Sequence, residues 1–281
     1  MSRVEEILNL VKFVQPFPKV ARRVMELLED PDVDVKTLAE VIQYDQVITA
    51  NVLKICNAPY FGLARKVSSL DDALVVIGHD TLRDIIITSS SARFYKGDVG
   101  AGYELEQGEL WKHSVAVGIL AKHLVGKIKE VEAGTAFTAG LLHDIGKRFL
   151  SSFVADDFEK IMDKVARERC SFVEAEKELL GITHAELGGI ILKRWEFPEE
   201  IQQAVLHHHD PKALEMAPLV ALVALSNTLV ISMGIGVGAD GLATKMQGEA
   251  LRRFGITQPH LDMCMANLLQ ELEAAEDLLH L

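Results

Sequence analysis

Cysteine is scarce in this sequence. Only Cys56, Cys170 and Cys264 occur among 281 residues. They lie far apart, are odd in number and form no Cys-x-x-Cys pair, so they provide no disulfide framework. Three reduced thiols are typical of a cytoplasmic protein, and this is the location that we expect.

Positive charge is also in short supply. Lysine and arginine number 29 against 41 acidic residues, which gives a formal net charge of −12, and the basic residues form no block. Duplex nucleic acids and anionic membranes both require a concentrated positive surface. Neither is therefore expected as a partner. The N-terminal stretch 1–6 has acids where a signal peptide needs basic residues.

A long apolar segment free of charge occurs once, at 217–239. Pro218 opens it, the polar residues 226–228 interrupt it, and glycines from Gly234 onward break its end. The uninterrupted part, about 219–233, is shorter than the roughly 20 residues that a bilayer-spanning helix needs. The segment therefore predicts a helix buried in a globular core, with no membrane association.

What the sequence does contain is helical periodicity. Hydrophobic residues make up 49% of the chain and recur mostly at helical spacing, which predicts an all-α fold. Three glycines within 97–102 mark a boundary between an N-terminal helical subdomain, 1–97, and a second helical subdomain, 98–281. The expected helices are 20–28, 35–44, 47–56, 69–77, 80–95, 105–126, 131–143, 156–168, 171–179, 184–194, 198–209, 217–233 and two more within about 245–280, split at 255–259.

Half of the ten histidines belong to one set with an aspartate. Imidazole and carboxylate are common ligands of divalent transition metals. Each pair of adjacent residues can reach one site best where its helix ends, and Ile145-Gly146 is a plausible ending for the first. Four elements would then converge, as in sites built between the helices of a bundle. The candidate metal ligands are His113, His143, Asp144, His184, His208 and His209.

Five imidazoles and a carboxylate exceed what a tetrahedral zinc ion requires. The surplus suggests either one six-coordinate metal or two metals bridged by Asp144. Iron or manganese suits this mixed nitrogen and oxygen set, and zinc is also compatible. Such metals could activate water and hold a phosphate, with Asp144 and Lys147 as candidate catalytic residues. Two alternatives stay open: Lys147 is a solvated lysine, or the histidines only form hydrogen bonds.

The motifs resemble those of the HD superfamily of metal-dependent phosphohydrolases, and more closely its HDOD branch, the HD-related output domain of bacterial signalling proteins. The resemblance covers about residues 13–230. It implies an HD-domain-like helical bundle preceded by an N-terminal helical subdomain, with further helices at the C-terminus. The segments that carry it, in order, are 15–21, 45–58, 67–78, 181–188 and 208–211.

The chain departs from the family pattern in two places. Asn227 stands where the last metal-binding aspartate is expected, and its amide oxygen can coordinate a metal without supplying charge. No Gly-Tyr-Pro stretch follows His209, so hydrolysis of cyclic di-GMP is not expected. Glu109 matches an extra ligand position in the branch that hydrolyses cyclic di-GMP, and it shares a helix face with His113.

Two functions follow from the resemblance. The first is a signalling module that binds a signalling protein partner or a small phosphate-bearing ligand, with a metal that stiffens the C-terminal half. The second is an active phosphohydrolase or phosphodiesterase on a nucleotide or another phosphate ester. The sequence shows no receiver, kinase or membrane domain, so the input would come from a partner or a ligand.

Overall fold

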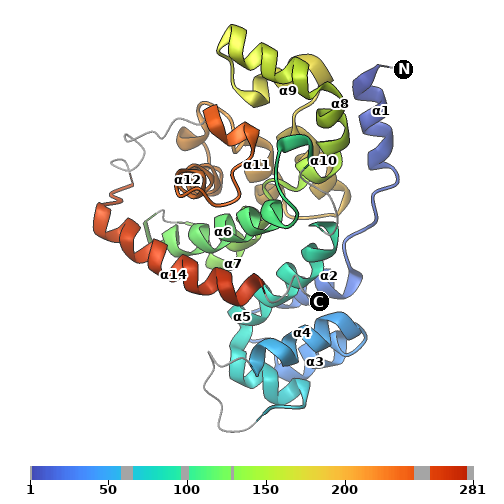
Figure 1. The fold of residues 1–281 in the computed structure, drawn as a ribbon. Helices are drawn as coiled ribbons and strands as arrows, with labels where there is room; N and C mark the ends of the chain where they lie inside the picture. Colours follow the sequence, from blue (N-terminus) through green and yellow to red (C-terminus); the bar gives the residue numbers. More distant parts are fainter. Residues whose placement is uncertain (1, 58–65, 96–100, 128–129, 244–253, 277–281) are drawn as a thin grey trace. The chain divides into compact units, whose positions relative to one another are not determined.

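The computed structural model describes residues 2–57, 66–95, 101–127, 130–243 and 254–276. Within these ranges every regular element is a helix and no strand occurs, which confirms the all-α fold (Figure 1). The β-prone run 85–88 lies inside a helix and is buried, as expected. Its neighbours at helical spacing outweigh its local β propensity.

The chain forms two compact units: residues 16–93, and residues 1–15 together with 94–281. The division expected from the sequence, 1–97 and 98–281, stays a prediction, because part of the glycine-rich boundary lies outside the described residues. The first fifteen residues group with the second half of the chain. They include α1 (Arg3–Val11), a helix that the sequence pattern did not predict. A capping box between Ser2 and Glu5 begins it.

The described residues of the unit 16–93 form four helices, and most of them begin after a residue that is favoured as a helix N-cap. Asp34, Asp45 and Ser69 each accept a hydrogen bond from a backbone N–H in the first turn of the helix that follows. Gly78, at φ 71°, interrupts the last of the four, so the two helices expected on either side of it are confirmed. The helices are α2 (Lys19–Leu27), α3 (Val35–Ile42), α4 (Gln46–Cys56) and α5 (Leu70–Ala92).

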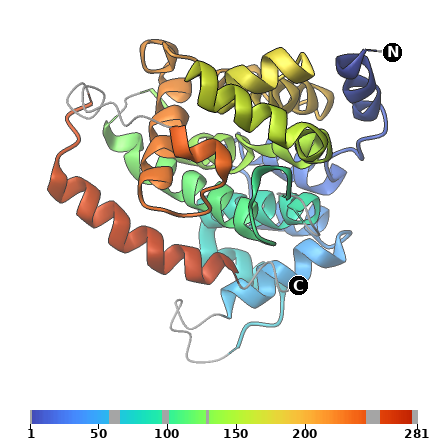
Figure 2. The ribbon, with the colours of Figure 1, turned by 45° about the horizontal axis from the view of Figure 1, so that its top comes forward.

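The other unit builds its core around two closely crossing helices, α6 and α7. A Cβ atom added to Gly140 would lie 2.8 Å from the Cα of Gly118, so only glycine permits this approach. Helices α12 and α14 also pack on α6 (Figures 1 and 2). Besides α1, the α-helices that the structure describes in this unit are α6 (Glu109–Leu124), α7 (Ala133–Leu142), α8 (Ile145–Glu168), α9 (Phe172–Leu180), α10 (His184–Arg194), α11 (Glu199–His207), α12 (Pro218–Ser232) and α14 (Gln258–Glu276).

Helix α8 begins earlier than the sequence indicated. The expected start at 156 is wrong, because α8 begins at Ile145, directly after the end of α7 at Leu142. Gly146 does not end a helix. A Cβ atom there would overlap the backbone carbonyl of His184, so this glycine lets α8 and α10 touch. The sequence signal for a break was real, but the break is only two residues long.

Helix α12 is the charge-free segment. Most of its residues are buried, which confirms a core helix. Across the described ranges, none of the helices combines the length and hydrophobicity that crossing a bilayer would require. Of the two C-terminal helices expected, α14 is present after the break at 255–257. The other falls largely on residues 244–253, outside the described residues.

Candidate metal centre

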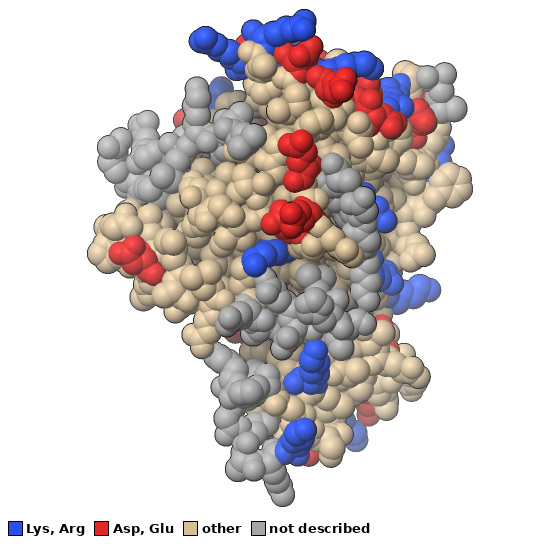
Figure 3. Space-filling model, viewed as in Figure 1, with Lys and Arg blue, Asp and Glu red and all other residues tan. Residues whose placement is uncertain are grey.

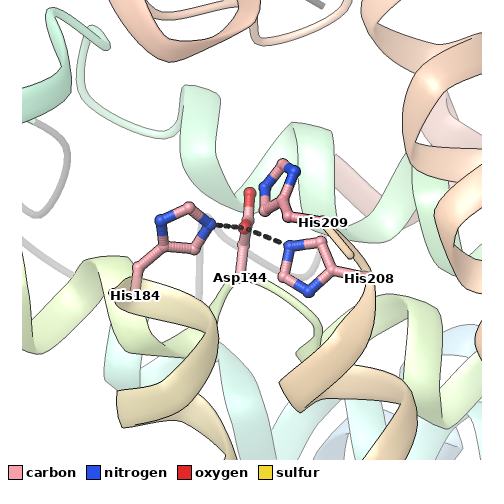
Figure 4. Close-up of side chains that lie close together, drawn as sticks. All are labelled: Asp144, His184, His208 and His209. Atoms are coloured by element: carbon pink, nitrogen blue, oxygen red, sulfur yellow. Dashed lines mark ion pairs between the residues drawn. The ribbon is translucent and has the colours of Figure 1, made fainter. Parts of the chain in front are cut away.

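Asp144 lies at the centre of the predicted ligand set. It occupies the junction between α7 and α8, where His143 ends one helix and Asp144 precedes the next. His184 is the first residue of α10, and the Thr183–Glu186 capping box fixes that start as predicted. His208 and His209 follow α11 (Figure 4). Helix termini thus deliver most of the donors, because a helix end lets adjacent side chains reach one point.

The two carboxylate oxygens of Asp144 face different histidines. Oδ1 lies 3.4 Å from Nε2 of His184 and 3.5 Å from Nε2 of His208. Oδ2 lies 3.3 Å from Nε2 of His143 and 3.7 Å from Nε2 of His113. Donor atoms therefore form two groups that share Asp144: one with His184, His208 and His209, and one with His113 and His143, all within 4.8 Å of one another in each group.

Hydrogen bonds on the outer side of the rings set the histidine tautomers. Nδ1 of His143 lies 2.7 Å from the Gly140 carbonyl, and Nδ1 of His208 lies 2.7 Å from the Val205 carbonyl. A carbonyl only accepts, so each Nδ1 carries a proton, and a ring in its neutral form then has its lone pair on Nε2. Outer partners of this kind are typical of metal-binding histidines.

The ring nitrogens and carboxylate oxygens that face the centre of the site receive no hydrogen bond. Nε2 of His143, His184, His208 and His209 is buried without a hydrogen bond. Both carboxylate oxygens of Asp144 are also buried without a hydrogen bond, and their charge is balanced by an ion pair with Lys147. Buried acceptors without partners are costly, and a cation bound between them removes that cost. The residues present therefore fit a divalent metal, and the interpretation that the histidines only form hydrogen bonds does not account for this geometry.

His113 and Asn227 are in direct contact. His113 Nε2 lies 3.0 Å from Asn227 Oδ1, while His113 Nδ1 lies 3.0 Å from the Ile235 carbonyl. If Nδ1 carries the proton, two acceptors face each other at Nε2. Two ligands bound at right angles about 2.1 Å from one cation lie about 3 Å apart, so this contact suits shared coordination. The alternative is a reversed amide whose NH₂ donates to the ring.

Burial dominates the electrostatics of the histidines. It lowers the pKa of His113 and of His208 to about 4, and that of His209 well below its usual range. Burial would raise the pKa of Asp144, but His143 and Lys147 hold it well below the ordinary value. The metal-free site therefore contains neutral imidazoles at His113, His208 and His209 and an ionised carboxylate at Asp144, which are the forms that bind metals.

Lys147 is buried, so the interpretation of a solvated lysine is wrong. Its Nζ lies 2.7 Å from Asp144 Oδ2 and 2.6 Å from Asp240 Oδ2, and its side chain is 5% exposed. Burial alone would lower its pKa, but the two carboxylates raise it, so the ammonium stays charged. A permanent cation thus stands beside the histidine cluster.

Two carboxylates near the site were missed by sequence reasoning. Glu176 on α9 accepts from His184 Nδ1 at 2.9 Å and from the Tyr103 hydroxyl at 2.7 Å. The charge of Glu176 outweighs burial and raises the pKa of His184. Asp240 pairs with Lys147 from the segment after α12. Both look like ordinary surface acids in the sequence, and no spacing to the histidines singles them out.

Glu109 is not brought into the donor groups. It is the first residue of α6 and is half-buried, and its carboxylate belongs to neither group around Asp144. Its expected role as an extra ligand has no support from this arrangement. His113 lies one turn further along α6 and does reach the site. The two residues share a helix face, but only His113 belongs to a donor group around Asp144.

Comparison with known proteins gives a family match. The model of the HDOD domain matches residues 14–211. A crystal structure of an HDOD domain protein of unknown function from Geobacter sulfurreducens is 28% identical, with a TM-score of 0.72, covering 98% of this chain and 97% of that one. The fold thus occurs in a solved structure of nearly the same length.

Curated relatives are longer. A protein of unknown role from Treponema pallidum is 22% identical over 223 residues, 77% of this chain and 42% of that protein. Ribonuclease Y from Thermus thermophilus is 30% identical over 156 residues, 55% of this chain and 22% of that protein. The chain therefore spans less than half the length of these relatives.

Proposed function

The chain belongs to the HDOD family, and on this premise we propose that it is a bacterial signalling module with an HD-type metal centre. In this proposal a metal bound to the histidine cluster holds the helices of the second unit together. The module acts by binding a signalling protein or a small phosphate-bearing ligand. The family and the donor set support it.

The observation that carries this proposal is the closure of the site. His113, His143, Asp144, His184, His208 and Asn227 are each 4% exposed or less, and among the residues of the two donor groups His209 alone is partly exposed. Structural metal sites are closed by protein ligands, whereas catalytic sites keep a position open for water or substrate. A centre this deeply enclosed suits a metal that joins α6, α8, α10 and α11 better than one that turns over substrate in this state.

The residues that would hold the metal follow from the geometry. Asp144 would bridge two positions, one with His184, His208 and His209 and the other with His113, His143 and Asn227. Iron or manganese suits the mixed nitrogen and oxygen donors, and zinc is compatible. A bound metal would supply Lewis acidity and a more acidic water.

The second candidate is a metal-dependent phosphohydrolase or phosphodiesterase. Lys147 favours it, because a charged ammonium beside a metal centre suits an anionic ester. The partial similarity to proteins named ribonuclease Y points to the same class of chemistry. On the face drawn in Figure 3, described acidic and basic side chains stand mixed, which does not favour a long nucleic acid as substrate.

Two measurements on one preparation test the proposal. Elemental analysis of protein purified without added metal is expected to find one or two equivalents of iron, manganese or zinc per chain. Phosphate esters and nucleotides, offered with manganese or iron, are expected to show turnover at the level of buffer. Metal content near zero would contradict the metal centre.

Turnover that His143→Ala abolishes would establish the phosphohydrolase instead. His79→Ala is the matched control, because His79 lies on α5 in the other unit and belongs to neither donor group. It should leave metal content and any turnover unchanged.

A further inference from the structure

A glycine-rich segment after α12 lies against the metal centre. We call residues 234–241 the strap. Its last three residues begin a short 3-10 helix, η6 (Ala239–Ala243). The Ile235 carbonyl accepts the hydrogen bond from His113 Nδ1 at 3.0 Å. Gly236 has φ +56°, and a Cβ atom there would lie 2.7 Å from His113 Cβ. The strap therefore both orients a metal-binding histidine and packs directly on it.

The strap also contacts the other side of the site. A Cβ atom at Gly238 would overlap the carbonyl oxygen of Tyr103, the residue whose hydroxyl donates to Glu176. Two residues later, Asp240 pairs with Lys147 at 2.6 Å. Glycine is required at 236 and 238 because the backbone of the strap runs so close to the site that side chains would not fit there.

The Lys147–Asp240 pair is enclosed, with side chains 5% and 6% exposed. A buried charge is costly without a partner, and Lys147 already pairs with Asp144. The strap supplies a second buried carboxylate, Asp240, to the same ammonium. Lysine is a common binder of phosphate groups, and a phosphate oxygen offers the same charge and acceptor as the Asp240 carboxylate. A neutral or cationic ligand could not replace it.

We propose that the strap is a latch in which Asp240 occupies the oxyanion position on Lys147, and that a phosphate-type oxyanion displaces Asp240 and releases the strap from the metal centre. This rests on the proposed function for the ligand class, but needs neither turnover nor a bound metal. Release would also withdraw the Ile235 carbonyl from His113. Ligand binding would therefore remove a hydrogen bond that orients one of the candidate metal ligands. The buried site thereby becomes reachable.

The test is hydrogen–deuterium exchange of the full-length chain with inorganic phosphate, compared with chloride at equal ionic strength. Phosphate is expected to raise exchange in peptides covering 234–241 severalfold. Asp240→Asn should raise that exchange without phosphate. If the latch is closed in about nine molecules of ten, the same variant should bind phosphate about tenfold more tightly by calorimetry. Lys147→Met should remove the response to phosphate.

Asp163→Asn is the matched control, because it removes an exposed ion pair with Arg167 on α8. It should change neither exchange nor phosphate affinity. Wild-type exchange that does not respond to saturating phosphate would overturn the latch, as would Asp240→Asn protein that binds phosphate no more tightly. The wild-type measurement decides the matter even if Asp240→Asn does not fold.

Running both arms with and without chelator separates this proposal from the metal centre. Protein that contains no metal as purified, before any chelator is added, but still responds to phosphate would refute the metal proposal alone. A chain that binds metal but shows no exchange response would refute the latch alone.

Discussion

At the scale of single residues, the site is defined by which atoms lack partners. The rings of His143, His208 and His184 face Asp144 with Nε2 and are held from behind through Nδ1, by a backbone carbonyl or by Glu176. This arrangement leaves inward lone pairs that only a cation satisfies well. The sequence predicts the candidate ligand residues because their type and order are distinctive, and the structure brings His113, His143, Asp144, His184, His208 and His209 together. The residues behind them could not be predicted, because a carbonyl or an acid eight residues from a histidine carries no such signal.

Glu176 should be a positioning residue for His184. Glu176→Gln keeps the size of the side chain but removes the charge that supports the Nδ1 proton. Loss of such an outer partner typically weakens metal binding about 10–100-fold, and we expect the same here in a chelator competition assay. Glu178→Gln, an exposed position on the same helix, should bind metal like the wild type. Equal affinities for both variants would contradict this role.

The buried histidines should make the metal-free protein sensitive to mild acid. The pKa of His113 and of His208 is lowered from 6.5 to about 4, so the unfolded chain binds more protons between these values. Stability is therefore full above pH 6.5 and falls as the pH drops toward 4, by up to about 3 kcal/mol for each histidine. His184, whose pKa is raised, opposes this partly.

Urea unfolding of chelator-treated protein between pH 4.5 and 7.5 measures this dependence. His113→Gln combined with His208→Gln should flatten the slope, whereas His79→Gln should not. A wild-type unfolding free energy that is independent of pH over this range would show that the two rings titrate normally.

At the scale of elements, glycines at helix crossings decide how the site is assembled. Gly146 brings α8 against the first residue of α10, and Gly140 brings α7 against α6. The sequence placed most helices well from periodicity and caps, and the start of α10 at His184 was predicted to the residue. It misplaced the start of α8, because a glycine required for close packing was interpreted as a helix end.

Gly146→Ala should therefore damage both stability and the site. Its Cβ would overlap the carbonyl of His184 and lie 2.8 Å from the backbone nitrogen of Gly188, and backbone atoms cannot move aside as a side chain can. We expect a loss of about 3 kcal/mol in the unfolding free energy, measured in urea. Gly126→Ala, where a Cβ would meet no atom within 4 Å, is the control and should change stability by less than about 0.5 kcal/mol. Similar stabilities of the two variants would contradict the packing argument.

At the scale of the whole molecule, the metal centre lies entirely within the unit formed by 1–15 and 94–281. Its donors come from α6, the α7–α8 junction, α10 and the turn after α11, with Asn227 on α12 nearby. A cation bound to all of them would link segments more than a hundred residues apart. Its binding free energy would therefore add to the stability of this unit, whereas the described residues of the unit 16–93 contribute no donor to the groups.

Removing the metal should lower the melting temperature. Metal at 100 times its Kd adds about 2.7 kcal/mol, which corresponds to a fall of roughly 5–10 °C on chelation in a unit of this size. Differential scanning calorimetry with and without chelator measures the shift, and added manganese or iron should reverse it. His143→Ala protein should not respond to the chelator. An unchanged wild-type melting temperature would argue that no metal stabilises this unit.

The sequence by itself determined the all-α fold, the family and the set of donor residues, because periodicity, caps and ordered motifs are written locally. Only the tertiary structure decided which donors share an oxygen of Asp144, that Lys147 is buried between two carboxylates, and that Asp240 and Glu176 belong to the site. Those relations join residues that are far apart in the chain or ordinary when taken singly. These contacts depend on which segments lie close in space, on burial and on the need to pair buried charges. A local sequence pattern contains none of this information.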